Sequence, residues 1–282
     1  MPVDVKVANQ SVPLDRSFGI ETGNGALLTD TLLLTLFFFL AALLYSSVGH
    51  AGASGYLAAM ALLGTAPSTM KPTALALNII VATIATFKFY RAGYFRWSLL
   101  WPFALTSVPF AFLGGIFSIP EVAYKPLVGL TLIYAAFKML LVSHHSNETV
   151  QKPLTLPLAL VFGSIIGLLS GLTGVGGGIF LTPLLLFLGW AKTRESSGVS
   201  AAFILFNSVA GLAGLLTKSV TMPSTLAFYS LSVVIGGWIG AEYGSRRLTP
   251  PTWRKLLALV LLIAGGKMLL VLVPHVSGNL HQ

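Results

Sequence analysis

The sequence contains no cysteine in its 282 residues and has few charged residues. Without cysteine, no disulfide framework, thiolate metal site or cysteine nucleophile can form. Charged residues make up only 9% of the chain, whereas a soluble domain usually carries roughly 25%. Hydrophobic residues reach 55%, and apolar runs long enough to span a bilayer recur throughout. These features exclude an ordinary soluble protein and predict an integral membrane protein.

Acidic residues are absent from the middle of every apolar run. All eight lie in tails, in loops or near the ends of runs: Asp4, Asp15, Glu21, Asp30, Glu121, Glu148, Glu195 and Glu242. A buried cation would find no counter-charge, so we do not expect carboxylate-based Na⁺ or proton sites. No Gly-Lys-Ser/Thr motif for ATP hydrolysis and no nucleophile–base pair or metal cluster occurs, so we do not expect an enzyme. The 17 basic residues form no run with interleaved aromatics, so a nucleic-acid partner is not expected.

The chain carries ten apolar segments, five in each half. They cover 30–48, 52–64, 72–90, 98–118 and 122–142, then 157–173, 176–189, 197–217, 224–244 and 252–273. The second and seventh segments reach only about 20 Å as helices, less than the ~30 Å hydrocarbon core, so they predict broken or tilted helices packed inside the protein. We expect a polar, retained N-terminal tail at 1–29, a first transmembrane repeat at 30–142, a cytoplasmic linker at 143–156, a second repeat at 157–273 and a C-terminal tail at 274–282.

Sequence recurrence and charge relate the two halves. The Lys-Met-Leu-Leu sequence at Lys138 recurs at Lys267, and Asn78 and Asn207 both lie early in the segment that follows a short one. If all ten segments cross the membrane, 11 of the 17 basic residues lie on one side; if the short segments are re-entrant, the basic residues divide almost evenly. The positive-inside rule favours ten crossings. Five crossings per half is an odd number, which predicts an inverted second repeat and both termini outside.

A stretch of small residues interrupts each half after a long apolar segment. We call residues 49–55 (GHAGASG) the first break and residues 171–178 (GLTGVGGG) the second break; each precedes a short segment. Glycine lets backbone approach a ligand and leaves N–H groups free at a helix start, where an anion gains from the helix dipole. Matched breaks in two halves are typical of a transporter with its substrate site at the breaks. Close helix packing is the alternative role of such glycines.

Six polar side chains add candidates for the site. His50 lies in the first break, and the ordinary pKa of histidine suits proton coupling as well as substrate binding; bonding to backbone is its other role. Lys71, just before Pro72 at an expected helix start, attracts anions or snorkels as a flanking residue. Polar groups in apolar segments usually face the protein interior, where they contact substrate or bond between helices. These are Thr73, Asn78, Ser200 and Asn207.

The sequence of residues 174–186 (GVGGGIFLTPLLL), followed by that of residues 200–211 (SAAFILFNSVAG), resembles the sulfite exporter TauE/SafE family of permeases. Residues 49–93 look like the matching half, and the resemblance extends over 30–273. It implies a multi-pass plasma-membrane carrier for small sulfur-containing anions such as sulfite, thiosulfate or sulfonates. The first break departs from the family's glycine-rich pattern at His50, Ala51, Ala53 and Ser54.

These observations predict an all-α integral membrane protein of the cell membrane, with about ten membrane segments in two inverted five-segment repeats, each with a short glycine-broken helix. The predicted function is secondary transport of a small anion by alternating access; the alternatives are an anion channel and a non-transporting membrane subunit of a larger complex. The expected partners are the anion and the lipid bilayer, and no cofactor or metal is expected. The predicted substrate site consists of Gly49, His50, Gly52, Ser54, Gly55, Lys71, Thr73, Asn78, Gly174, Gly176, Gly177, Gly178, Ser200 and Asn207.

Overall fold

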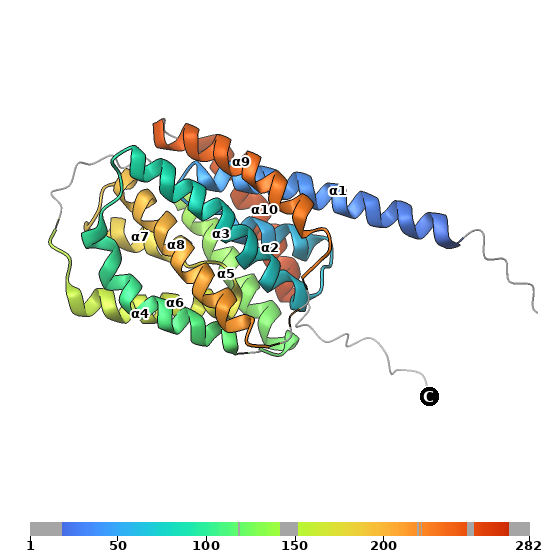
Figure 1. Cartoon of the computed structure of the whole chain (residues 1–282), viewed down its shortest axis with the longest axis horizontal. Coiled ribbons are helices and arrows are strands. Elements are labelled where there is room, and N and C mark those ends of the chain that lie inside the picture. The colour runs from blue at the N-terminus through green and yellow to red at the C-terminus, as the bar shows by residue number, and fades with distance from the viewer. Residues whose placement is uncertain are drawn as a thin grey trace, which may run out of the picture.

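The computed structural model describes residues 19–117, 119–141, 152–218, 220, 222–246 and 251–270. Within these residues the chain forms ten α-helices and no strand (Figure 1). The first half holds α1 (Gly19–Ser46), α2 (Ala53–Leu62), α3 (Pro67–Arg91), α4 (Trp97–Ile116) and α5 (Glu121–Leu141). The second half holds α6 (Leu156–Thr173), α7 (Gly178–Phe187), α8 (Thr193–Leu215), α9 (Leu226–Arg246) and α10 (Pro251–Leu270). The all-helical class is confirmed, and each of the ten predicted segments corresponds to one of these helices.

Six of these helices are long and apolar enough to cross a membrane within the described residues. They are α1 from Leu28 onward, α3, α4, α6, α8 and α9. The short apolar helices α2 and α7 have 10 residues each, so each spans about 15 Å of helix. A multi-pass membrane protein follows from the six spans.

Three helices begin earlier than their apolar segments suggested. α1 begins at Gly19 within the expected tail, α3 at Pro67 and α8 at Thr193. Apolar residues mark the part of a helix that is suited to lipid. The helical backbone can extend beyond them into polar sequence where a residue favours the start of a helix. Proline at the first position favours the start of α3. In α8 the backbone N–H of Lys192 donates to the Glu195 carboxylate at 3.0 Å, as in a capping box.

The early start of α3 corrects one expectation. Lys71 and Pro72 were expected at a helix start, but both lie in the second turn of α3. Pro72 has no N–H, so it cannot donate the helical hydrogen bond to the Ser68 carbonyl four residues earlier. Lys71 is therefore buried in the bundle, with 7% of its surface exposed, and does not flank a span.

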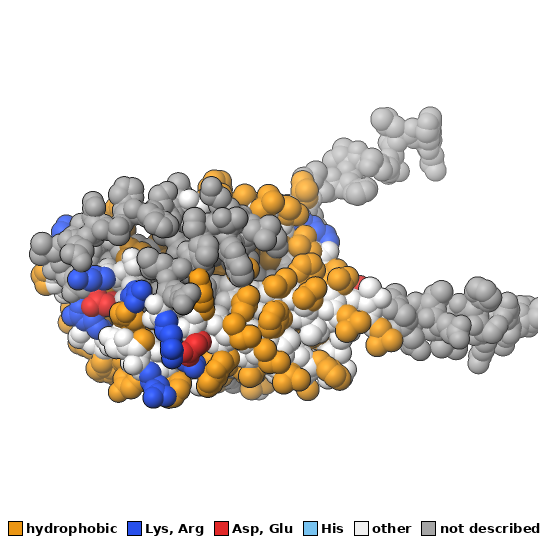
Figure 2. Space-filling model, turned by 90° about the horizontal axis from the view of Figure 1, so that it is seen from above, with side chains coloured by type: hydrophobic (Ala, Val, Ile, Leu, Met, Phe, Trp, Pro, Cys, Tyr) orange, Lys and Arg blue, Asp and Glu red, His pale blue; other side chains and the backbone are white. Residues whose placement is uncertain are grey.

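Basic residues gather at one end of the bundle, which we call the arginine end. There the start of α4 meets the start of α8, with 3.4 Å between Arg96 and Glu195, and the end of α3 meets the end of α9 through Lys88 and Glu242. Figure 2 shows basic and acidic side chains gathered at one end of the molecule, beside a largely hydrophobic surface. We call the other end, where α1 begins, the opposite end.

Each short helix returns the chain toward the end where its preceding long helix began. α1 reaches the arginine end, and α2 then leads to the opposite end, where the Leu62 carbonyl accepts a hydrogen bond from Lys267 at 2.6 Å. α6 begins at the arginine end, and α7 ends beside its start, where the Lys152 N–H donates to Gly189 at 2.9 Å. In each half, the short helix thus reverses the direction of the long helix before it (Figure 1).

Glycine stripes let helices of the two halves pack closely. On α6, Gly163, Gly167 and Gly171 lie against the α4 backbone. On α9, Gly236 and Gly240 lie against the α1 backbone, and Gly244 lies against Ser47, directly after α1. A Cβ at Gly171 would collide with the Ala111 carbonyl of α4. If α1–α5 are matched in order with α6–α10, the packed pair α4–α6 corresponds to the packed pair α9–α1. In two further packed pairs, α3–α8 and α5–α10, a helix contacts its own counterpart. Small residues at such contacts are typical of membrane bundles.

Candidate functional site

Both breaks contain glycines in a left-handed backbone conformation. In the first break φ is 77° at Gly49 and 112° at Gly52; in the second it is 83°, 83° and 82° at Gly174, Gly176 and Gly177. Residues with a Cβ rarely adopt these angles, which explains the choice of glycine. The two breaks are therefore real turns of the backbone as well as small-residue sequences.

The short helices begin directly after these turns without side-chain caps. Gly52 precedes α2 and Gly177 precedes α7, and neither N-cap makes a side-chain hydrogen bond. The first N–H groups of an α-helix have no partner inside the helix and carry the positive end of its dipole. Each short helix thus presents backbone donors at the end that adjoins its break.

His50 joins the first break to the second half. Its Nε2 lies 3.2 Å from the Gly178 carbonyl and 3.3 Å from the Thr182 hydroxyl, and its Nδ1 lies 3.2 Å from the Val48 carbonyl. The Thr182 hydroxyl is in turn 2.7 Å from that of Ser200 on α8. Of the predicted residues, His50, Gly178 and Ser200 thus meet in one polar chain, and Thr182 completes it.

Asn78 joins α3 to the second break. Its side-chain amide donates to the Val175 carbonyl at 3.3 Å and lies 3.4 Å from the Ser208 hydroxyl on α8. The Oδ1 atom of Asn78 is buried without a hydrogen-bond partner. Asn207 differs, because its amide donates to Phe203 within its own helix at 3.0 Å. Only Asn78 of the two asparagines bonds across the halves.

Gly176 and Gly177 of the second break lie in close contact with the side chains around them. A Cβ at Gly176 would lie 2.6 Å from the Asn78 amide, and one at Gly177 would lie 2.9 Å from both Ile166 and Phe203. The backbone therefore fits against α3, α6 and α8 with no room for a side chain. We call His50, Asn78, Thr182, Ser200 and Ser208, together with residues 176–178, the central cluster.

Several predicted residues lie outside the central cluster. A Cβ at Gly52 would meet the Tyr56 ring, and one at Gly55 would meet Ala41 and Tyr45 of α1, so both glycines pack within the first half. Gly49 lies against the backbone of Ser197 on α8. Ser54 and Thr73 are buried, and the Thr73 hydroxyl has no hydrogen-bond partner.

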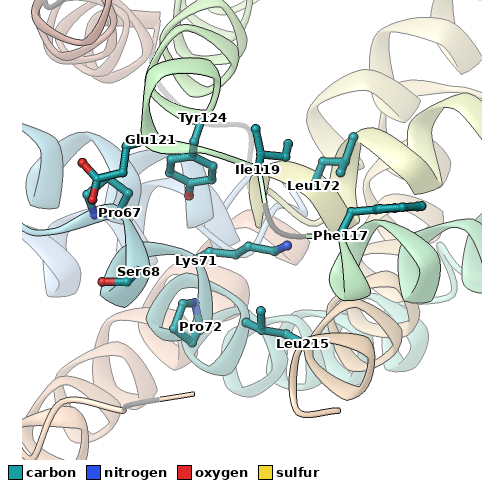
Figure 3. A pocket seen from close by; sticks show the side chains of 10 residues that line it. All are labelled: Pro67, Ser68, Lys71, Pro72, Phe117, Ile119, Glu121, Tyr124, Leu172 and Leu215. Carbon is teal, nitrogen blue, oxygen red and sulfur yellow. The ribbon is translucent and has the colours of Figure 1, made fainter. Parts of the chain in front are cut away.

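Lys71 lies toward the opposite end and lines a pocket of about 210 Å³ (Figure 3). Its ammonium donates to the carbonyl oxygens of Gly114 at 3.0 Å and Gly115 at 3.4 Å, in the last turn of α4. Gly174, the first glycine turn of the second break, lies beside it, since a Cβ there would be 3.3 Å from Lys71 Cγ. The second break therefore connects the Lys71 pocket with the central cluster.

Sequence reasoning did not single out Thr182 or Ser208. Thr182 is the one polar residue of α7, directly before Pro183, and Ser208 follows Asn207. A polar residue inside a short apolar helix is the signal that could have identified Thr182. Ser208 has no such signal, because serine is frequent at ordinary helix contacts in membranes.

Comparison with known proteins gives the family. The model of the family described as Sulfite exporter TauE/SafE matches residues 34–268. The chain belongs to this family. A probable membrane transporter protein of Sinorhizobium fredii is 40% identical over 244 residues, which cover 86% of this chain and 99% of the relative. A probable membrane transporter protein of Methanocaldococcus jannaschii is 26% identical over 211 residues, which cover 70% of this chain and 78% of the relative. No solved structure matches.

Family and spans together establish the coarse function. The TauE/SafE match and the relatives indicate a membrane transporter, and the six candidate spans make it a multi-pass cell-membrane protein. Both breaks lie within the matched residues. A transporter needs a path for its substrate, and the contacts of the breaks mark where the two halves meet.

Proposed function

We propose that this TauE/SafE protein is a secondary carrier that moves a small sulfur-containing oxyanion, such as sulfite, thiosulfate or a sulfonate, by alternating access. The observation that carries the proposal is the meeting of the two breaks, where His50 lies 3.2 Å from the Gly178 carbonyl. In transporters built from two repeats, substrate sites lie between the repeats at broken helices. The family description, which names sulfite, supports the choice of a sulfur anion.

The charges around the breaks favour an anionic substrate. The backbone donors at the starts of α2 and α7 attract negative charge. The sequence has no acidic residue from position 31 to 120 or from 149 to 194, the stretches that contain the two breaks. A cation at the central cluster would find no carboxylate from these stretches, whereas an oxyanion would accept N–H bonds from Gly178 and Ile179. Asn78 holds the second break in position through Val175.

The packing of the halves supports an inverted repeat and a gate. A two-fold axis that relates the two repeats would place the pair α4–α6 on the pair α9–α1, and both pairs are in contact. At the arginine end, Lys88 pairs with Glu242 and Arg96 with Glu195, and each pair joins the first half to the second. In the proposed cycle these pairs close the arginine end and separate when the site opens there. Rocking of one repeat against the other gives alternating access around a fixed site.

Reconstitution tests the carrier directly. The purified protein in proteoliposomes is expected to take up radiolabelled sulfite, thiosulfate or methanesulfonate with saturation, and to show counterflow when the vesicles are preloaded with unlabelled anion. Flux that neither saturates nor shows counterflow means a channel. Protein-free vesicles provide the background, and flux no greater than that background for all three anions refutes the carrier.

Cysteine labelling tests the inverted arrangement, because the native chain has no cysteine. A cysteine at Ser224 in the α8–α9 connection is expected to react with an impermeant maleimide in intact cells. Cysteines at Ala92 or within 143–149 are expected to react only after the cells are opened, since the basic loops are predicted to be cytoplasmic. Labelling of the latter positions from outside contradicts the inverted repeat with both termini outside.

A further inference from the structure

We propose that the pocket at Lys71 is a separate binding site for a small oxyanion, a vestibule that the substrate occupies between the opposite-end solution and the second break. The inference rests on the proposed anionic substrate. Ten residues line the pocket: Pro67, Ser68, Lys71, Pro72, Phe117, Ile119, Glu121, Tyr124, Leu172 and Leu215. Most of these side chains are apolar, so a charge inside the pocket is poorly screened by water.

The ammonium of Lys71 is the reason to expect an anion. Lys71 is 7% exposed, and its hydrogen bonds go to the neutral carbonyls of Gly114 and Gly115. None of the ion pairs within the described residues includes it, and Lys218 adds a second positive charge that acts on it. A buried charge without an opposite charge is costly, so an anion beside Lys71 would be stabilised strongly.

The carboxylate in the pocket does not fill this role. Glu121 lies 3.3 Å from Lys125 and keeps 61% of its side chain exposed. Figure 3 shows the Lys71 ammonium pointing toward Phe117, while the Glu121 carboxylate lies on the far side of the pocket and points away. The space around the ammonium is therefore left to an external anion.

The size and position of the pocket fit a substrate on its way to the breaks. Its volume of about 210 Å³ equals about seven water molecules at ~30 Å³ each, enough for a small oxyanion with some of its hydration. Leu172 in its wall belongs to the last turn of α6, and Gly174 lies against Lys71. An anion held at Lys71 is thus adjacent to the backbone of the second break.

A cysteine at Phe117 reports occupancy of the pocket. Phe117 is 58% exposed and stands where the ammonium points. The probe is sulfate, compared with gluconate at equal ionic strength, because sulfite itself reacts with maleimides. In detergent, sulfate is expected to slow maleimide labelling of Phe117→Cys about tenfold at ten times the half-protecting concentration. Labelling of Ala92→Cys at the arginine end is expected to stay unchanged.

Replacing the ammonium separates a charged site from a general salt effect. Lys71→Met removes the charge at similar length, and a buried charge replaced by an apolar side chain is usually tolerated. When Phe117→Cys is combined with Lys71→Met, sulfate is expected to give no protection against maleimide labelling. When it is combined with Lys71→Arg, sulfate is expected to protect as before. Thermal unfolding of each variant verifies that it is folded. Equal protection by sulfate and gluconate, or unchanged protection in folded Lys71→Met, overturns the vestibule.

A lipid phosphate is the other source of the same chemistry. Micelles doped with phosphatidylglycerol distinguish the two, because the vestibule requires protection by sulfate in lipid-free detergent. Protection by the lipid alone overturns the proposal. Its outcome is independent of transport: protection by sulfate without flux in vesicles refutes the carrier and keeps the site, whereas flux without protection refutes the site and keeps the carrier.

Discussion

The two breaks occupy matching places in their halves but contribute different chemistry. The first break supplies a side chain, His50, which bonds across to α7. The second supplies backbone from three glycines with positive φ, held by Asn78 through Val175. Their helices differ as well, because nine of ten residues of α2 are buried, whereas α7 buries only Gly178, Ile179, Leu181 and Leu185. The comparison teaches that two breaks in similar places can contribute differently, one through a side chain and the other through its backbone.

The largest effect is expected from closing the second break. Gly177→Val should abolish transport while the protein remains folded in the membrane. The side chain would collide with Ile166 and Phe203 and would oppose a φ of 82°, costs of about 1–3 kcal/mol each. The loss of transport is measured as flux into proteoliposomes that contain equal amounts of wild-type or variant protein.

Gly189→Val is the matched control for this prediction. Gly189 also has a positive φ of 70°, but the nearest atoms to its Cβ are 3.9 Å away, on Lys152. It therefore tests backbone strain without a collision in the central cluster and should retain most of the flux. Normal transport by well-expressed Gly177→Val would show that the second break serves only packing.

The first glycine with a positive φ in each break, Gly49 or Gly174, should differ in its tolerance of a side chain. Gly49→Ala and Gly174→Ala both strain the backbone by about 1–2 kcal/mol. At Gly49 the methyl group would also collide with the Ser197 carbonyl oxygen, whereas at Gly174 the nearest atoms, Lys71 Cγ and the Lys71 carbonyl oxygen, are 3.3 Å away. The free energy of unfolding is therefore expected to fall by ~1–3 kcal/mol more in Gly49→Ala than in Gly174→Ala. Thermal unfolding in detergent measures the stability of the two variants. Gly64→Ala is the control, because a Cβ at Gly64 would lie in open space. Equal losses of stability at Gly49 and Gly174 contradict the prediction.

The two asparagines provide a test of bonding across the halves. Asn78→Ala loses the bond to Val175 in the second break, whereas Asn207→Ala loses a bond within α8. A hydrogen bond is worth about 1 kcal/mol net, so Asn78→Ala is expected to lower initial flux about fivefold to tenfold. Asn207→Ala should lower it by less than about twofold. A larger loss of flux in Asn207→Ala than in Asn78→Ala would contradict this prediction.

The smallest effect is expected at His50 and concerns pH. Both ring nitrogens face carbonyl oxygens, and only the imidazolium can donate to both, so protonation strengthens this link between the halves. His50→Gln keeps hydrogen-bonding capacity but cannot titrate. It should flatten the pH dependence of initial flux between about 5.5 and 7.5, a range set by the ordinary histidine pKa of about 6.5. An unchanged pH profile removes His50 from the coupling mechanism.

The sequence predicted the helices and the two breaks, whereas the contacts of the central cluster could be predicted only in part. Apolar run length predicted ten helices, and all ten exist. The glycine pattern predicted two breaks, and five of their glycines have the positive φ that a turn requires. Helix starts at Gly19 and Pro67 were missed, because hydrophobicity reports lipid contact rather than backbone hydrogen bonding. The inverted relation of the repeats stays a prediction.

The sequence by itself determined that this chain is a helical membrane protein with paired breaks, because bilayer thickness fixes span length and only glycine adopts these turns freely. Only the tertiary structure decided which residues meet. His50 and Gly178 are 128 residues apart, and Thr182, Asn78 and Ser208 meet the breaks only where α3, α7 and α8 pack. It also moved Lys71 from a helix flank into a buried pocket. Such contacts depend on the packing of one half against the other, and no local sequence pattern records that packing.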